Sequence, residues 1–253
     1  MTAYEVRHPP RSHEGDPDAP GVLVLHGYTG NPGTMRVLAD ALVDTGFAVE
    51  VPRLPGHGTH IDDMLDTGWA DWSAHVEEVY ADLEARRPGR VVVVGLSMGG
   101  TLAAWLAGRH PEIRGAVFIN AAVAPRDPME RQLVADMIAA GEEVVGGTGR
   151  SDIADPDAVE DAYVGSPLRP LLSLIDATTE LQSLLPNITC PSLVMSSRVD
   201  NVVDPAASDH LAASLGGPVE RLWLERSWHV ATLDHDRDLI AERTIDFVRK
   251  VTA

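Results

Sequence analysis

The chain has 253 residues, the length of a single domain that can bury a substantial core. Apolar residues make up 44% and charged residues 23%, a balance that excludes an intrinsically disordered chain. Its 38 Asp and Glu outnumber its 20 Lys and Arg, and the resulting formal charge of −18 disfavours nucleic acid or an anionic membrane surface as a partner.

Residues 1–20 are polar, and they lack the basic and then apolar regions of a secretory signal peptide. No apolar run along the sequence approaches the ~20 residues of a membrane helix. We therefore expect a cytoplasmic protein without stable membrane insertion. The sequence leaves the oligomeric state open.

Apolar, β-branched runs alternate with longer amphipathic stretches, a pattern typical of a parallel sheet with crossover helices. In chain order, we predict strands at residues 21–26, 47–51, 91–95, 115–120, 192–196 and 219–225. Helices are predicted at residues 34–45, 69–87, 98–109 and 239–251. The first of these helices is expected to end at Gly46, a typical C-terminal cap.

Between residues 124 and 190 this alternation breaks, because two or three amphipathic stretches follow one another without a strand. Residues 146–157 (GGTGRSDIADPD) are typical of a loop. A segment this long is not expected to be a bare loop, so we predict a small helical cap inserted into a single domain, residues 1–253. The alternative is a set of ordinary helices packed on the sheet.

Ser97 is the predicted nucleophile, at the centre of the sequence Gly-Leu-Ser-Met-Gly between a predicted strand and a predicted helix. Small residues two positions either side of the serine permit a sharp turn that lifts its hydroxyl above the sheet. The turn also directs the helix N-terminus, with its free amides, at the charge that develops when an ester carbonyl is attacked. This context favours catalysis over a glycine-rich turn without a chemical role.

A serine hydroxyl needs a base, and on such a sheet the acid and then the histidine are expected on loops after later strands. His229 follows the predicted strand 219–225, whereas its competitor His235 lies in a polar turn that we expect to face solvent. Asp200 follows the strand 192–196 and is the predicted acid. Its alternative, Asp204, precedes Pro205 and is expected to cap a helix that starts there.

The loop after the first predicted strand reads His-Gly-Tyr-Thr-Gly and is the expected site of the oxyanion hole. We predict that the backbone amides of Tyr28 and Met98 donate to the oxyanion. His26 is expected to support this loop by a hydrogen bond rather than to act as a base.

No metal is expected. His57 and His60 lie in a turn-rich segment without a matching cluster of carboxylates or cysteines. The one cysteine, Cys190, excludes an intramolecular disulfide and a cysteine-bound structural zinc. Its place before Pro191, at the start of a predicted strand, indicates a small core residue.

Five motifs in this order resemble the small bacterial carboxylesterases and thermostable monoacylglycerol lipases of the α/β-hydrolase superfamily: HGYTG, RLPGHG, GLSMGG, SRVD and SWHVATLDHD. The resemblance runs from about residue 20 to the C-terminus. It implies the α/β-hydrolase fold, with a mostly parallel central sheet flanked by helices and a small helical cap. By this resemblance Ser97, Asp200 and His229 match the catalytic triad, and Tyr28 and Met98 match the oxyanion amides. Tyr28 stands where such esterases often have phenylalanine.

The expected reaction is acyl transfer to Ser97 followed by hydrolysis, with no cofactor. The substrate is expected to be a short- to medium-chain ester or a monoacylglycerol. Five apolar residues of the predicted cap are expected either to line an acyl pocket or to form the core of the cap: Met137, Ile138, Leu171, Leu174 and Ile175. The alternatives are amidase, cofactor-free peroxidase or carbon–carbon hydrolase chemistry on the same fold, or a non-catalytic ligand-binding homologue.

Overall fold

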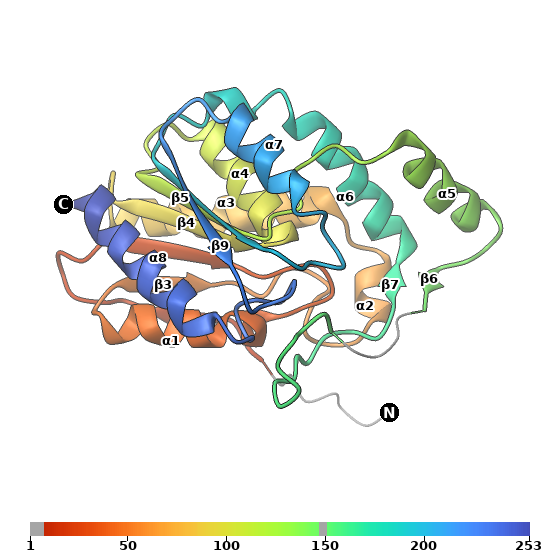
Figure 1. Ribbon diagram of the computed structural model, residues 1–253, viewed down its shortest axis with the longest axis horizontal. Helices are drawn as coiled ribbons and strands as arrows, with labels where there is room; N and C mark the ends of the chain where they lie inside the picture. Colours follow the sequence, from red (N-terminus) through yellow and green to blue (C-terminus); the bar gives the residue numbers. More distant parts are fainter. Residues whose placement is uncertain (1–7, 147–150) are drawn as a thin grey trace.

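A central seven-stranded sheet organises the computed structural model, which describes residues 8–146 and 151–253. The strand order is β1-β3-β2-β4-β5-β8-β9 (Figure 1). β1 pairs antiparallel with β3, and the other pairs in this sheet run parallel. The strands are β1 (Arg11–His13), β2 (Gly21–Leu25), β3 (Ala48–Val51), β4 (Val91–Leu96), β5 (Gly115–Ile119), β8 (Ser192–Ser197) and β9 (Val219–Leu224).

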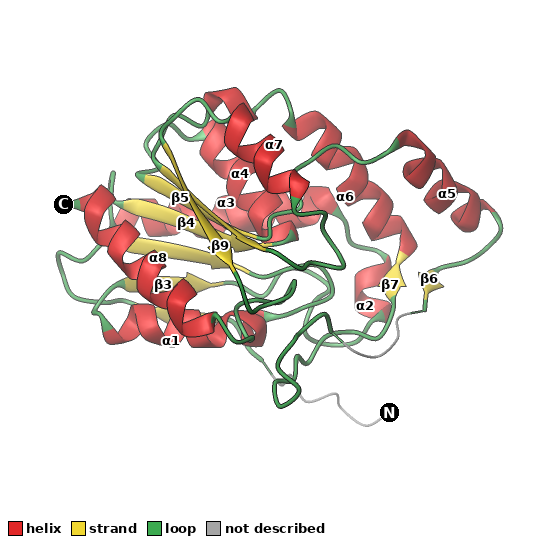
Figure 2. Ribbon diagram, viewed as in Figure 1, coloured by secondary structure: helices red, strands yellow, loops and turns green. Residues whose placement is uncertain are grey.

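Helices cover both faces of the sheet (Figure 2). One face carries α1 (Arg36–Asp44) and α8 (Arg237–Thr252), which pack against each other. The other face carries α3 (Trp69–Arg86), α4 (Met98–Arg109), α6 (Leu168–Leu181) and α7 (Ala206–Ser214). In β4, Val91 and Val93 enter the core on the α4 side, whereas Val92 and Val94 enter the core on the α8 side. Burial on both faces explains why this strand is apolar throughout.

The predicted strands and helices are all present, with ends that differ by at most three residues. The helix predicted from residue 34 begins with a 3-10 turn, η1 (Pro32–Met35), and becomes α-helical at Arg36. Gly46 follows α1 with a positive φ of 84°, as expected for a C-terminal cap. Two elements were not predicted from the sequence: β1, whose three exposed residues carry no apolar alternation, and the short helix α2 (Asp62–Leu65).

The segment between β5 and β8 contains a strand pair that the sequence analysis did not predict. β6 (Val144–Val145) and β7 (Ser166–Pro167) form a two-residue antiparallel ladder, too short to leave a periodic signal. Helix α6 packs on α3 and α4, and α5 (Pro128–Ala139) packs on α6, before the chain returns through η2 (Leu185–Asn187). Residues 147–150 of the predicted loop lie outside the described residues.

The loops that follow β2, β4, β8 and β9 carry the predicted site residues. Because the carboxyl ends of parallel strands lie at one edge of a sheet, these loops meet there. The fold thus brings together residues that are up to 203 positions apart in the sequence, from His26 to His229. Within the described ranges, no helix combines the length and the apolar character needed to cross a bilayer.

Candidate active site

Ser97 lies at a sharp turn between β4 and α4, within residues 95–100, which we call the elbow. A Cβ atom on Gly95 would lie 2.1 Å from the carbonyl oxygen of Gly99, and one on Gly99 would lie 2.2 Å from that of Leu25. No side chain fits at either position without moving backbone. The two glycines therefore allow helix α4 to begin directly against the end of the sheet, with Ser97 at the turn.

Backbone strain is concentrated around this turn. In the described part of the chain, three non-glycine residues have positive φ: Thr29 at 60°, Ser97 at 54° and Asn120 at 43°. They follow β2, β4 and β5, which are neighbours in the sheet. Such conformations cost about 1–3 kcal/mol each and persist where the surrounding structure enforces them, as is common at functional sites.

The loop after β2 passes directly beside the serine. A Cβ on Gly27 would lie 3.3 Å from the Cβ of Ser97, so the loop backbone is in close contact with the elbow. Over the residues that the structure describes, the amide N–H groups of Tyr28 and Met98 donate to no protein acceptor. Two amides next to one hydroxyl can therefore donate to an oxygen that develops negative charge there.

Two buried imidazoles lie close to this loop, and the first of them binds it directly. His26 contacts the carbonyl of Gly27 through Nδ1 at 2.9 Å and accepts from the amide of Leu54 at Nε2, 3.3 Å, which confirms its predicted supporting role. His57 contacts the carbonyl of Pro55 through Nδ1, also at 2.9 Å. Burial lowers the pKa of His26 to about 3 and that of His57 to about 4, so both imidazoles are neutral at pH 7.

Asp200 and His229 are in direct contact. The Oδ2 atom of Asp200 lies 2.8 Å from Nδ1 of His229, and Oδ1 accepts from the amides of Val202 and Val203 at 2.9 and 2.8 Å. The Asp200 side chain is 2% exposed. This bond assigns the imidazole proton to Nδ1 and leaves Nε2 unprotonated, and His229 lines the same cavity as Ser97.

The competing residues have other positions. Asp204 accepts from the amide of Ala206 at 2.9 Å and so caps the start of α7, as predicted. His235 is exposed, again as predicted, and lies at the surface 3.9 Å from Asp155.

Side chains that the sequence analysis did not single out fix the loop of residues 225–236, here called the histidine loop. Asn120 donates through Nδ2 to the carbonyl of His229 at 2.8 Å and accepts from the amide of Ser197 at the same distance. Asp236 accepts from the amides of Arg226 and Ser227, each at 2.9 Å. The available signals were a polar residue directly after a buried strand and the two aspartates of the LDHD sequence.

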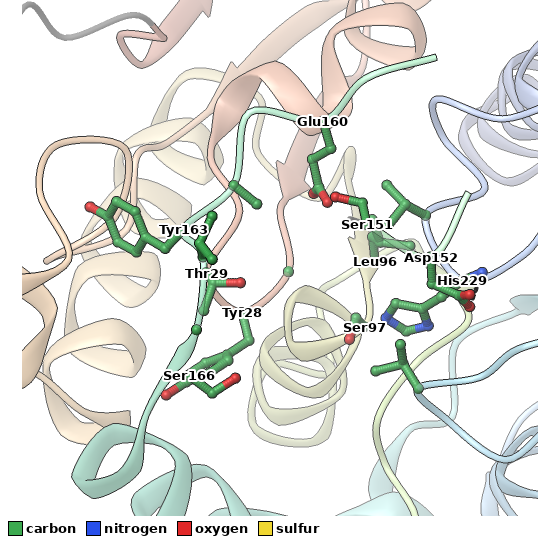
Figure 3. Close-up of a pocket in the computed structure, with 16 residues that line it drawn as sticks. Tyr28, Thr29, Leu96, Ser97, Ser151, Asp152, Glu160, Tyr163, Ser166 and His229 are labelled. Carbon is green, nitrogen blue, oxygen red and sulfur yellow. Dashed lines mark hydrogen bonds between the residues drawn. The ribbon is translucent and has the colours of Figure 1, made fainter. Parts of the chain in front are cut away.

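Ser97 and His229 line one cavity of about 370 Å³, and their side chains lie next to each other in Figure 3. One wall is built from residues 151–166, which we call the wall segment. Its polar residues Ser151, Asp152, Glu160 and Ser166 line the cavity, whereas the ring of Tyr163 points away from Ser97 and its hydroxyl binds the backbone of Gly56 and Thr59. Apolar contacts come from Leu96, Val164, Val202 and Val230.

None of the five apolar residues considered for an acyl pocket is among those that line this cavity, and the alternative expectation, a core of the cap, describes four of them. Four of them pack in the interface between α5 and α6: Met137, Ile138, Leu171 and Ile175. Leu174 belongs to the main core below. An apolar helical pattern shows that one face of a helix is buried, but it does not show what covers that face. Here the neighbouring helix covers it.

Comparison with known proteins agrees with this geometry. The chain is 42% identical to a thermostable monoacylglycerol lipase of Bacillus sp. (strain H-257), over 91% of this chain and 90% of the relative. It is 26% identical to a carboxylesterase of Bacillus subtilis (strain 168), over 91% and 92% of the two chains.

A solved structure from a study of LipS and LipT, two metagenome-derived lipolytic enzymes, superposes with a TM-score of 0.89 at 38% identity, over 96% and 97% of the two chains. The monoacylglycerol lipase of Paleococcus ferrophilus shares the fold, with a TM-score of 0.78 at 17% identity, over 94% and 97%. A family model described as "Serine aminopeptidase, S33" matches residues 17–236. The chain therefore belongs to this family and is a serine hydrolase with the α/β-hydrolase fold.

Proposed function

We propose that this enzyme hydrolyses short- to medium-chain carboxylic esters or monoacylglycerols through an acyl-enzyme on Ser97. The observation that carries the proposal is the bond between Asp200 and His229 beside a strained serine at a strand-to-helix turn. The names of the lipase and carboxylesterase relatives support an ester as substrate. They also support a monoacylglycerol as one member of that class.

In the first half of the reaction, Nε2 of His229 takes the proton from Ser97 while Oγ attacks the carbonyl carbon. Asp200 keeps the imidazole in the required tautomer and stabilises the imidazolium. The amides of Tyr28 and Met98 donate to the oxyanion. As the carbon–oxygen bond of the ester breaks, the imidazolium gives its proton to the alcohol that leaves.

In the second half, water takes the place of the alcohol. His229 removes a proton from the water as the oxygen attacks the acyl-enzyme, and the same amides hold the second oxyanion. The imidazolium then returns the proton to Oγ of Ser97. The carboxylic acid leaves, and the reaction consumes one water for each ester.

The polar wall of the cavity favours an alcohol group that carries free hydroxyls, as a monoacylglycerol does. Glu160 already accepts from the hydroxyl of Thr34 at 3.0 Å, and a carboxylate has further acceptor capacity. We propose that residues 124–190 act as a cap and that their wall segment contacts the alcohol. Glu160→Gln should then raise KM about tenfold for a monoacylglycerol and much less for p-nitrophenyl esters, measured as initial rates.

Labelling with a fluorophosphonate, followed by digestion and mass spectrometry, tests the nucleophile. We expect the label on Ser97, and a Ser97→Ala variant that is about 10⁴-fold less active on p-nitrophenyl esters. Ser166→Ala, which changes another serine of the same cavity, should still be labelled at Ser97. An unlabelled Ser97, or a fully active Ser97→Ala, would contradict the proposal.

A substrate panel tests the reaction class. It contains p-nitrophenyl esters of increasing chain length, monoacylglycerols and, because of the name of the matching family, aminoacyl nitroanilides. We expect ester cleavage to exceed amide cleavage. A preference for the nitroanilides would overturn the assignment to esters.

A further inference from the structure

The carboxylate of Asp152 lies between the two loops that carry Asp200 and His229. Its Oδ2 accepts from the amide of His229 at 3.1 Å and from that of Asn201 at 3.0 Å. Its Oδ1 accepts from Nδ2 of Asn201 at 2.7 Å, and its own carbonyl accepts from the amide of Val230 at 3.0 Å. One side chain of the wall segment therefore binds the backbone of the base and the residue that follows the acid.

The histidine loop binds the wall segment in return, through Asp234, which is completely buried. The carboxylate of Asp234 accepts from the amides of Ala154 and Asp155 at 2.8 and 2.9 Å. The same two oxygens accept from Trp228 and His235 within the histidine loop, at 2.8 and 2.7 Å. The two segments are thus joined by a reciprocal pair of aspartates, each accepting backbone N–H groups of the other segment.

We propose that Asp152 is a positioning residue that orients His229 toward Ser97 and links this orientation to the wall of the substrate cavity. Two side chains hold the backbone on either side of the His229 side chain: Asp152 binds its N–H and Asn120 binds its carbonyl. Together, these two contacts fix the backbone of His229 and so the direction in which its side chain points. Because Asp152 and Glu160 belong to the same segment, the contact that orients the base and the cavity wall move together.

The arrangement uses both oxygens of the carboxylate as acceptors. Three N–H groups point at the Asp152 carboxylate, and charge-assisted bonds to a carboxylate are about twice as strong as neutral ones. In Asp152→Asn, the side-chain amide of Asn201 can turn to accept from the new NH2 group, so that the remaining oxygen still faces the amides of His229 and Asn201. The variant therefore removes the charge from the bond to His229 and weakens that bond.

The test compares kcat and KM for Asp152→Asn with those of two variants in the same segment. We expect Asp152→Asn to lower kcat about 10- to 100-fold with little change in KM, since misplacing a catalytic group by about 1 Å can cost that much. Asp157→Asn, an exposed aspartate of the same segment, should behave as wild type. Glu160→Gln should raise KM instead.

A second readout separates orientation from substrate binding. The rate constant for labelling of Ser97 by a small fluorophosphonate depends on the base but not on recognition of the ester's alcohol. We expect this rate to fall about tenfold or more in Asp152→Asn and to stay at the wild-type value in Asp157→Asn. Asn201→Ala, which removes the Nδ2 donor and keeps the bond to His229, should give a smaller loss of kcat.

Thermal denaturation is measured for every variant, and all rates are measured at one temperature that lies well below the lowest midpoint. A wild-type kcat in Asp152→Asn, or a change in its KM alone, overturns the inference. The inference rests on the proposed function, but the two can fail separately. If the unmodified enzyme is neither labelled nor active on esters, the proposed function fails; if it is active and Asp152→Asn keeps kcat and labelling rate, only the positioning role fails.

Discussion

The elbow and the histidine loop hold Ser97 and His229, the proposed nucleophile and base, in different ways. The elbow is held by close backbone packing, in which Gly95 and Gly99 leave no room for a Cβ. The histidine loop contains no glycine; three of its apolar residues are buried in the core, and side chains from remote parts of the chain, among them Asn120 and Asp152, bind its backbone. Ser97 is therefore placed mainly by the glycines of its own turn, and His229 is placed mainly by hydrogen bonds from distant residues.

This difference predicts different consequences of mutation. A change in the elbow should disturb the sheet and the helix together, so that stability and activity fall in parallel. A change in a side chain that binds the backbone of the histidine loop should leave the fold in place and reduce the rate of the chemical step. The following predictions test that contrast, beginning with the largest expected effect.

Gly99→Ala should lower the free energy of unfolding by about 3 kcal/mol or more. Its Cβ would lie 2.2 Å from the carbonyl oxygen of Leu25, and backbone must move to accommodate it. Gly146→Ala is the matched control, because no atom of the described residues lies within 4 Å of a Cβ at Gly146. Urea unfolding followed by circular dichroism measures the free energy of unfolding of the two variants. Equal midpoints would contradict the claim that close backbone packing holds the elbow.

The two buried histidines next to the elbow, His26 and His57, should also lower the free energy of unfolding in acid. The folded-state pKa values of His26 and His57, about 3 and about 4, lie below the ordinary value of 6.5. Above pH 6.5 neither state binds these protons; as the pH falls below 6.5, the unfolded state binds them first, so stability is lost down to the folded-state values. Between pH 6.5 and 5 this costs about 3 kcal/mol for the two groups together.

Urea titrations at several pH values measure this loss. His57→Asn keeps a donor for the carbonyl of Pro55 but removes one titrating group, so it should reduce the dependence on pH by about half. A pH dependence equal to that of the unmodified enzyme would show that other groups cause it.

Asn120→Asp should have a clear effect on catalysis together with a loss of stability, because the new carboxyl group is buried and faces the carbonyls of Trp228 and His229. The new side chain keeps the acceptor for Ser197 but places an oxygen against the carbonyl of His229, where Nδ2 now donates at 2.8 Å. We expect kcat to fall about tenfold, equivalent to about 1.4 kcal/mol, with KM nearly unchanged. Steady-state kinetics and a denaturation midpoint measure both quantities, and a loss of stability without a change in kcat would contradict the prediction.

The same contrast explains what could be predicted from the sequence. The sheet, its covering helices and the elbow follow from local patterns: apolar runs, helical periodicity and glycines at fixed spacing. The contact between Asp200 and His229 follows from chain order, because each residue comes directly after a strand of a parallel sheet.

The roles of Asn120, Asp152 and Asp234 do not follow from local patterns, although Asn120 comes directly after a buried strand and Asp234 belongs to the LDHD sequence. Each acts on backbone groups of segments that are distant in the sequence, and a backbone amide leaves no sequence signal. The apolar residues of α5 and α6 could not be assigned to a pocket or to a core for a related reason. Their sequence pattern is the same whether a substrate or another helix covers them.

The four N–H groups gathered on the buried Asp234 carboxylate also bear on how this enzyme could be re-engineered. A chimera that exchanges the region between β5 and β8 for that of a relative keeps these bonds only if the relative's backbone places two N–H groups at the positions of Ala154 and Asp155. A junction after residue 155 retains both donors, and it also retains Asp152. Such a chimera exchanges Glu160 and Tyr163 while it keeps every contact of the Asp234 carboxylate.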